Sequence, residues 1–181
     1  SAPALDLNLE GWLAEHLRDA FDSIHGGFGR ASKRIQEAPI RFVLARCRGG
    51  DGSMHDVGIR TLDAIGWSPL FDDVEGGVFR FAERRDWGQP HVEKLLRVNA
   101  SAVQVFLDGW AVFRESRYRD RAIQVIQYVT RTLVDRSNGG FFSSQFADDV
   151  YYGATTAERG LLESPSVDRA VYSGANSEMA R

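Results

Sequence analysis

The sequence predicts an all-α chain built from antiparallel helix pairs. Over long stretches apolar residues recur at steps of three and four, which is the period of a helix with one buried face. A Gly-Gly motif also recurs three times, at intervals of about 50 to 60 residues, within or just above the range that repeat architectures show. Aromatic residues follow these motifs, so we expect aromatic-rich loops gathered at one end of the helix pairs.

The apolar residues place the helices in order. The first lies in the N-terminal stretch, with one apolar face formed by Leu5, Leu9, Trp12, Leu13, Leu17 and Phe21. The segments "PIRFVLARC" and "DVGIRTLDAIGW" form a pair separated by "RGGDG". A longer helix is expected to start near Pro90, a residue suited to the first helical position, and to carry Val92, Leu95, Leu96, Val103, Phe106, Leu107 and Trp110. The next helix carries Ile123, Val125, Ile126, Val129 and Leu133.

The three Gly-Gly motifs mark where the chain turns back. They are "FDSIHGGFGR", "FDDVEGGVFR" and "VDRSNGGFFS", each with an acidic residue, a polar spacer, two glycines and an apolar or aromatic pair. Glycine supplies the left-handed conformation in which helices often end, and a second glycine lets the chain reverse. We expect all three turns at the same end of the molecule. The alternating pieces "VFRF" and "FFSSQF" after two of them predict short β-hairpins.

Composition and charge exclude several classes of protein. The 181 residues suit one domain, and 43% hydrophobic with 26% charged residues indicates a soluble globular chain. A net charge of -3 offers no basic excess for nucleic acid. No apolar run approaches the roughly 20 residues that span a bilayer, so no membrane partner is expected. The acidic N-terminal stretch is also unlike a signal peptide.

The ordinary signatures of cofactor and metal chemistry are missing. There is no phosphate-binding loop and no nucleophile elbow, so no cofactor is expected. The histidines His16, His25, His55 and His91 lack metal-ligand spacing, and no metal site is predicted. The single cysteine, Cys47, lies in an apolar helical stretch, which favours a buried side chain over a reactive thiol. A sequence with only one cysteine fits a reducing compartment, so we expect a cytoplasmic location.

One segment carries a resemblance to a known family. "DDVEGGVFRFAERRDWGQPHVEKLLRVNA" resembles the signature "GGGFxRYSxDxxWxxPHFEKMLYDNA" of the spermatogenesis-associated thioredoxin-domain proteins. "FDSIHGGFG", "GGFFSSQFADD" and "ESPSVDRAVYSGANSEMAR" resemble three further motifs of that family, in the family's order. Together they cover about residues 22–179. Val92, Leu95, Arg97–Val98 and Phe146 depart from the pattern, as does "RASKRIQ", so this is a divergent member and no activity that needs the replaced acids is assumed.

The resemblance implies a fold. Family members join a thioredoxin-like domain to a six-hairpin, glycosidase-like (α/α)6 toroid. A closed toroid needs about twelve helices, and the chain is long enough for about half of them. We therefore expect residues 1–181 to be a partial toroid domain, a fragment without the thioredoxin-like domain. Its exposed half-toroid faces should favour self-association.

The same resemblance suggests where a ligand would bind. Toroids of this kind bind ligands in a funnel at the inner-helix ends, and related toroids process sugars, which is an argument from fold alone. In the segment "DDVEGGVFRFAERRDWGQPHVEKLLRVNA" we expect ligand contacts from Arg80, Trp87 and Lys94, and acid or base chemistry from His91, Glu93 and Asp86. Each has a purely structural alternative: Trp87 as a plug against the core, Glu93 as a helix cap, and Lys94 on a solvated face.

Three functions remain open from the sequence, and it does not decide whether the chain is an enzyme. The first is a toroid domain, associated with a thioredoxin-like module, that binds a carbohydrate-like small molecule. The second is a sugar isomerase, epimerase or glycoside hydrolase. The third is a non-catalytic protein-interaction domain. Facing acids in the funnel would favour hydrolysis, paired histidines epimerisation, and an apolar inner surface protein interaction.

Overall fold

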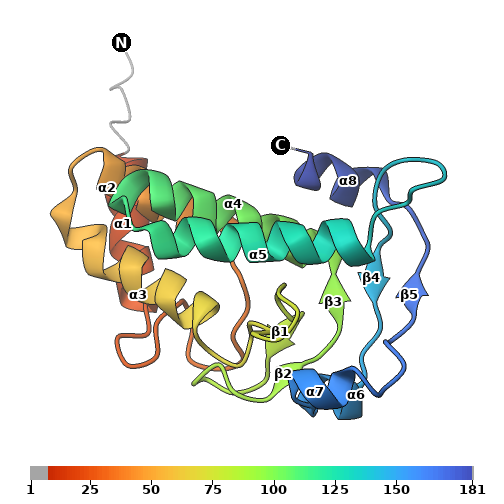
Figure 1. The fold of residues 1–181 in the computed structure, drawn as a ribbon. Coiled ribbons are helices and arrows are strands. Elements are labelled where there is room, and N and C mark those ends of the chain that lie inside the picture. The colour runs from red at the N-terminus through yellow and green to blue at the C-terminus, as the bar shows by residue number, and fades with distance from the viewer. Residues whose placement is uncertain (1–7, 181) are drawn as a thin grey trace.

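A computed structural model describes residues 8–180 of the chain. Its main helices are α1 (Leu9–Ala20), α2 (Glu37–Arg48), α3 (His55–Gly66), α4 (Leu96–Phe113), α5 (Ser116–Thr132) and α8 (Ser173–Met179) (Figure 1). A 3-10 turn, η1 (Gly52–Met54), leads into α3, and two short helices, α6 (Asp149–Gly153) and α7 (Thr156–Arg159), follow α5. The expected helix before the first Gly-Gly turn is present from Leu9, while Leu5 lies outside the described residues.

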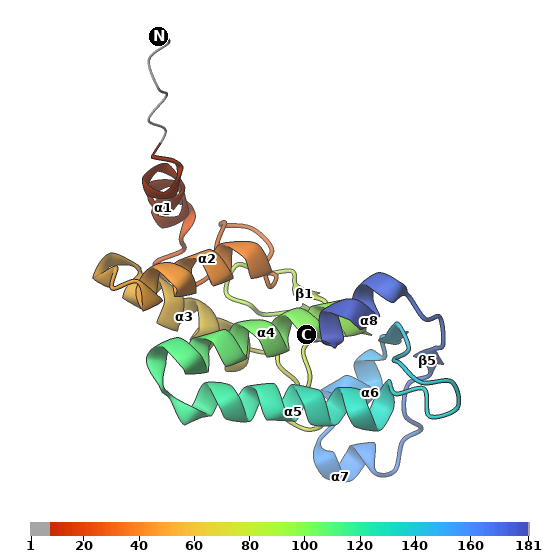
Figure 2. The ribbon, with the colours of Figure 1, turned by 90° about the horizontal axis from the view of Figure 1, so that it is seen from above.

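The helices form two rows. Helices α4 and α5 make an antiparallel hairpin joined by Arg114 and Glu115, and α2 packs on α4. Side-chain contacts fix the direction of this pair: Ser101 donates to Glu37, and Arg41 donates to Asp108, so α2 and α4 run parallel. Helix α8 packs on α4 (Figure 2). Helix α3 contacts α5. An inner row of α2, α4 and α8 is therefore backed by outer helices α3 and α5.

The structure corrects the expected start of the long helix. Residues Pro90–His91 form strand β2 and Lys94–Leu95 form strand β3, so α4 begins at Leu96. Strand β1 (Phe81–Ala82) pairs antiparallel with β2. Strand β3 pairs antiparallel with β4 (Ser144–Gln145), which also pairs with β5 (Val167–Asp168). The hairpin expected at "VFRF" is confirmed, whereas "FFSSQF" joins two distant segments and forms no local hairpin.

The three Gly-Gly turns share one construction. Bridges pair Phe21 with Phe28, Phe71 with Val78 and Val134 with Phe141, and the six glycines have φ between 70° and 83°. The first turn packs on α3, where Arg60 donates to its backbone, and the second packs on α5, where Arg131 does the same. The first two turns thus each lie beside the outer helix that leads to the next turn, which places the three turns at one end, as expected.

Two asparagines dock the inner helices on these turns in the same way. Asn99 of α4 accepts a hydrogen bond from Val78 N at 2.8 Å and donates to Val78 O at 3.1 Å. Asn176 of α8 accepts from Phe141 N at 2.7 Å and donates to Phe141 O at 3.0 Å. The sequence repeat therefore corresponds to a structural repeat, and α8 occupies in its unit the place that α4 occupies in the previous one.

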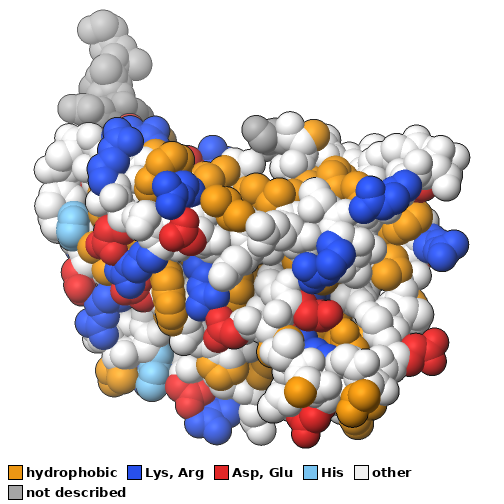
Figure 3. Space-filling model, in the orientation of Figure 1, with side chains coloured by type: hydrophobic (Ala, Val, Ile, Leu, Met, Phe, Trp, Pro, Cys, Tyr) orange, Lys and Arg blue, Asp and Glu red, His pale blue; other side chains and the backbone are white. Residues whose placement is uncertain are grey.

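The core lies between the two rows and under the turns. It includes Leu62, Ile65, Leu70, Leu96, Phe106, Tyr118, Val125, Tyr128 and Leu133. Space filling shows hydrophobic side chains across the upper part of the face that α4 and α5 present, with arginines among them (Figure 3). Within residues 8–180, none of the helices combines the length and apolar character that crossing a bilayer requires.

Candidate functional site

A cavity of about 980 Å³ lies between the inner helices α2 and α4. Its remaining walls come from the connection before α2 and from the segment that opens β1. Apolar contacts come from side chains such as Ile35, Leu44, Phe81 and Val98. The charged side chains that line it are Arg34, Arg41, Arg48, Arg80, Arg97, Glu37 and Asp108.

A hydrogen-bonded network crosses the cavity from helix to helix. Arg41 Nε donates to Asp108 Oδ2 at 2.9 Å, and Arg41 Nη1 donates to Glu37 Oε1 at 3.3 Å. Ser101 Oγ donates to the other oxygen of Glu37 at 2.7 Å. Residues four apart on a helix share a face, which is why Glu37 and Arg41 meet on α2. Because these groups are fixed by one another, they present preorganised polar atoms along the cavity.

Two of the predicted site residues meet at the cavity. Arg80 lines it, and its Nη1 donates to Glu93 Oε2 at 3.0 Å. The Arg80 side chain is half exposed, while Glu93 is mostly covered. Glu93 precedes β3 and is outside the first turn of α4, so the capping alternative is wrong. Its carboxylate instead holds the guanidinium of Arg80.

His91 lies next to this pair on strand β2. Its ring stacks on that of Phe81, which lines the cavity, with centroids 5.3 Å apart and planes 17° apart. His91 Nδ1 is buried and has no hydrogen-bond partner within residues 8–180. His91 belongs to strand β2 and not to the first turn of a helix, which the expected helix start near Pro90 had implied. A buried ring nitrogen without a partner is rare in folded proteins, which makes His91 a candidate functional residue.

Trp87 lies outside the cavity. Its side chain is 2% exposed, and its indole Nε1 donates to His25 O at 2.9 Å, in the first Gly-Gly turn. Gly27 of that turn lies against the ring, where an added Cβ would approach to 2.6 Å. The expected ligand contact is therefore not available in this structure, because neither ring face is exposed. Trp87 instead packs between the β1–β2 hairpin and the first Gly-Gly turn.

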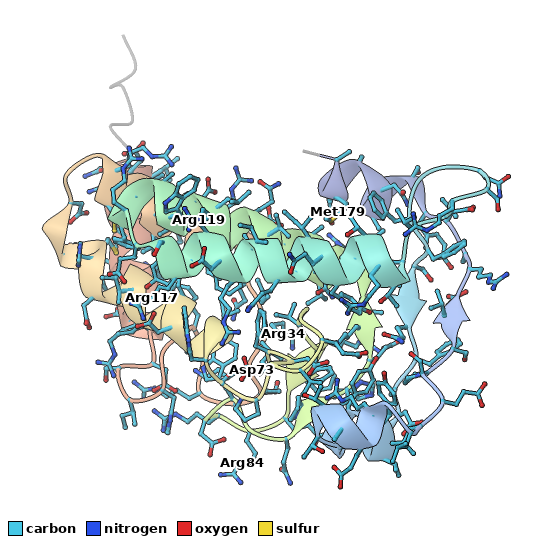
Figure 4. The ribbon with its side chains drawn as sticks, in the orientation of Figure 1. Arg34, Asp73, Arg84, Arg117, Arg119 and Met179 are labelled. Carbon is cyan, nitrogen blue, oxygen red and sulfur yellow. The ribbon has the colours of Figure 1, made fainter. Side chains whose placement is uncertain are left out.

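Asp86 also lies away from the cavity. Its carboxylate pairs with Arg84 and accepts from Gly88 N at 3.0 Å. Figure 4 shows Arg84 at the lower margin of the molecule, well separated from Arg34. The hydrogen bond from Arg84 lowers the pKa of Asp86, which disfavours a general-acid role. Of the two acids expected near the ligand, Glu93 is therefore the one that lies beside the cavity, through Arg80.

Lys94 is fully buried and touches only protein. Its Nζ donates to Asp72 Oδ2 at 2.6 Å and to Gly76 O at 2.8 Å, under the second Gly-Gly turn. Burial lowers the pKa of Lys94 to about 8, although Asp72 opposes the shift. Both the expected ligand contact and the solvated-face alternative are corrected, because no part of the side chain is exposed.

The sequence reasoning missed most of the cavity. Arg34, Glu37, Arg41, Ser101 and Asp108 come from segments that were assigned only to helices or to a departure from the family motif. The available signal was the spacing of Glu37 and Arg41 on one helical face. Among the described residues, no three His, Cys, Asp or Glu side chains cluster in a way that could hold a metal ion.

No family model matches the chain. Its sequence is, however, 31% identical over 151 residues to spermatogenesis-associated protein 20 of Mus musculus, covering 81% of this chain and 19% of that protein. The protein of the same name from Homo sapiens is 30% identical over 139 residues, covering 74% and 18%. The chain belongs to the family of spermatogenesis-associated protein 20. It spans about a fifth of the length of these curated relatives.

Solved structures identify the fold. A sugar epimerase from a ruminal bacterium aligns with a TM-score of 0.64 at 13% identity, covering 74% of this chain and 37% of that one. Cellobiose 2-epimerase from Spirochaeta thermophila gives 0.61 at 19%, covering 76% and 39%. A family 76 glycoside hydrolase from Bacteroides thetaiotaomicron gives 0.59 at 14%, covering 79% and 27%. The chain is therefore folded as part of an (α/α)6 toroid, as the sequence resemblance implied.

Proposed function

We propose that the cavity between α2 and α4 binds a carbohydrate-like ligand. The observation that carries this proposal is the network of Glu37, Arg41, Ser101 and Asp108 along an inner-helix cavity of about 980 Å³. That volume is at the upper end of the roughly 300–1,000 Å³ typical of small-molecule sites. Carboxylate, guanidinium and hydroxyl groups both donate to and accept from sugar hydroxyls. The similar toroids named as sugar epimerases and glycoside hydrolases add support from fold.

Calorimetric titration with a panel of mono- and oligosaccharides tests the proposal. At least one sugar should give saturable heat with the unaltered chain. Asp108→Asn should weaken that binding about tenfold, because a hydrogen bond to a charged group is worth roughly 1.5–3 kcal/mol. Asp120→Asn, on the exposed surface of α5, is the matched control and should bind normally. Absence of binding across the panel would remove the proposal.

A second candidate function is catalysis on the bound sugar, as an isomerase, epimerase or glycoside hydrolase. The buried Nδ1 of His91, next to the cavity-lining Phe81, favours it. His91 does not itself line the cavity, so its ring would turn towards the ligand to act as the base, while Glu93 would hold Arg80 in place. His91→Asn should then abolish turnover and leave binding within about twofold, whereas His16→Asn on α1 should change neither. Equal turnover by the His91 variant would exclude the role.

The interaction-domain alternative finds less support. An apolar inner surface would favour it, whereas the cavity carries seven charged side chains. Association with a thioredoxin-like module stays a prediction.

A further inference from the structure

The lining of the cavity between α2 and α4 holds more basic than acidic side chains. Five arginines and two acids line it, a formal excess of three positive charges in a chain whose net charge is -3. A neutral sugar needs no such excess. The excess of positive charge therefore points to a negatively charged group on the ligand. This inference rests on the proposed function.

The arginines differ in how they are neutralised. Both lining acids, Glu37 and Asp108, bind Arg41. Arg80 pairs with Glu93, and Arg97 Nε lies 3.3 Å from Glu178 Oε2. These two glutamates do not line the cavity themselves. The carboxylates near the cavity are thus already engaged by these three arginines.

Arg34 and Arg48 have no such partner among the described residues, but Arg48 lies in the last turn of α2, at the opposite end of that helix from Arg34. No carboxylate within residues 8–180 forms an ion pair with Arg34, and its side chain is exposed. The backbone explains its direction: Lys33 pairs with Ala82 in a β-bridge and turns its side chain into the first Gly-Gly turn. Neighbouring side chains in extended backbone point to opposite sides, so Arg34 turns into the cavity beside Arg80 and Phe81.

We infer that the cavity takes a carbohydrate that carries an acid group, a carboxylate or a phosphate, and that Arg34 binds this group. A guanidinium matches the two oxygens of either anion through paired N–H donors. The Glu37–Arg41–Asp108 network would contact the hydroxyls, and the anion would sit at the end of the cavity where Arg34, Arg80 and Arg97 converge on the N-terminal turns of α2 and α4. A uronic acid and a sugar phosphate share this chemistry.

Titrations of the chain with D-glucuronate, glucose 6-phosphate and D-glucose at low ionic strength test the inference. At least one of the two acids should bind at least tenfold more tightly than glucose, and added salt should weaken that binding because it screens the charges. Comparing the two acids tells the carboxylate from the phosphate source. Arg34→Gln should reduce acid binding about tenfold, Arg34→Lys should restore part of it, and glucose binding should not change. Arg136→Gln, an exposed arginine outside the cavity, is the control.

The outcomes separate the inference from the proposed function. Glucose binding as tightly as both acids would overturn the inference and leave the carbohydrate site standing. No binding of any of the three sugars would overturn both. Inorganic phosphate binding as tightly as glucose 6-phosphate would show that the sugar contributes nothing, which contradicts the carbohydrate site. An unchanged affinity in a folded Arg34→Gln variant would remove Arg34 from the site.

Discussion

Lys33 and Lys94 occupy equivalent places in two successive repeats. Each is fully buried, and each Nζ binds the aspartate that opens its Gly-Gly turn, Asp22 at 3.0 Å and Asp72 at 2.6 Å. They are the only lysines in the sequence. An ammonium offers three donors on a compact charge, and each lysine uses them on its aspartate and on turn carbonyls. These two ion pairs hold the first two Gly-Gly turns, and α4 docks on the second of them through Asn99.

Replacing Lys94 should therefore destabilise the fold. Lys94→Met leaves Asp72 buried with one cation, Arg159, in place of two. Breaking a buried pair costs about 3–5 kcal/mol, and we expect about 3 because Arg159 remains. Denaturation in urea measures it, with Arg119→Met at the exposed surface as a control that should lose less than about 1 kcal/mol. Equal losses in the two variants would contradict the structural role of Lys94.

Trp87 should act as a core residue. Trp87→Ala removes a side chain that is 2% exposed and should cost about 3–5 kcal/mol of unfolding free energy. Trp12→Ala, at 56% exposure, should cost far less. Thermal or urea unfolding decides between the two roles. A stable Trp87→Ala protein with weakened sugar binding would instead support the ligand contact that the sequence suggested.

The Gly-Gly turns allow a test of close packing with a matched pair. Gly76 and Gly139 have φ of 79° and 82°, so alanine is strained at both. A Cβ at Gly76 would lie 2.6 Å from Gln124 O, whereas a Cβ at Gly139 would meet nothing within 4 Å. Gly139→Ala should cost about 1–2 kcal/mol, and Gly76→Ala clearly more. Equal unfolding free energies would mean that the second turn does not pack on α5 as described.

Stability should fall in acid. Arg85, through its hydrogen bonds, lowers the pKa of Asp22, with help from Lys33 and against the effect of burial. In the unfolded chain an aspartate titrates near pH 3.9, so this stabilisation is present above about pH 4 and is lost as pH falls through the lower folded pKa. Arg85→Gln should make the loss below pH 4 shallower. The free energy of unfolding between pH 2 and 6 measures it, and an unchanged slope would contradict the pairing.

The sequence predicted the helical repeat well because its signals are local. Apolar spacing placed α2, α3 and α5, and the glycines placed the turns. The error at Pro90 has a tertiary cause: β3 pairs with β4, about 50 residues later in the chain, and no local pattern encodes that partner. The same limit explains Trp87, whose partner carbonyl belongs to His25. Self-association and a cytoplasmic location stay predictions.

The candidate site was harder to predict because its parts come from different helices. Arg80 was predicted as a ligand contact from the family motif, and it does line the cavity. Arg41 and Asp108 lie 67 residues apart and meet only when α2 and α4 pack in parallel. Polar residues on a helix ordinarily indicate a solvated face, and here the missing information was that this face lines an inner cavity.

The carbohydrate site is tested most directly by an NMR titration that resolves the arginine Nε–Hε signals. On adding D-glucuronate or glucose 6-phosphate, the signals of Arg34, Arg41 and Arg80 should shift together with one saturation curve, while those of Arg119 and Arg136 should stay in place. Uniform small shifts, or shifts confined to surface arginines, would contradict a site between α2 and α4.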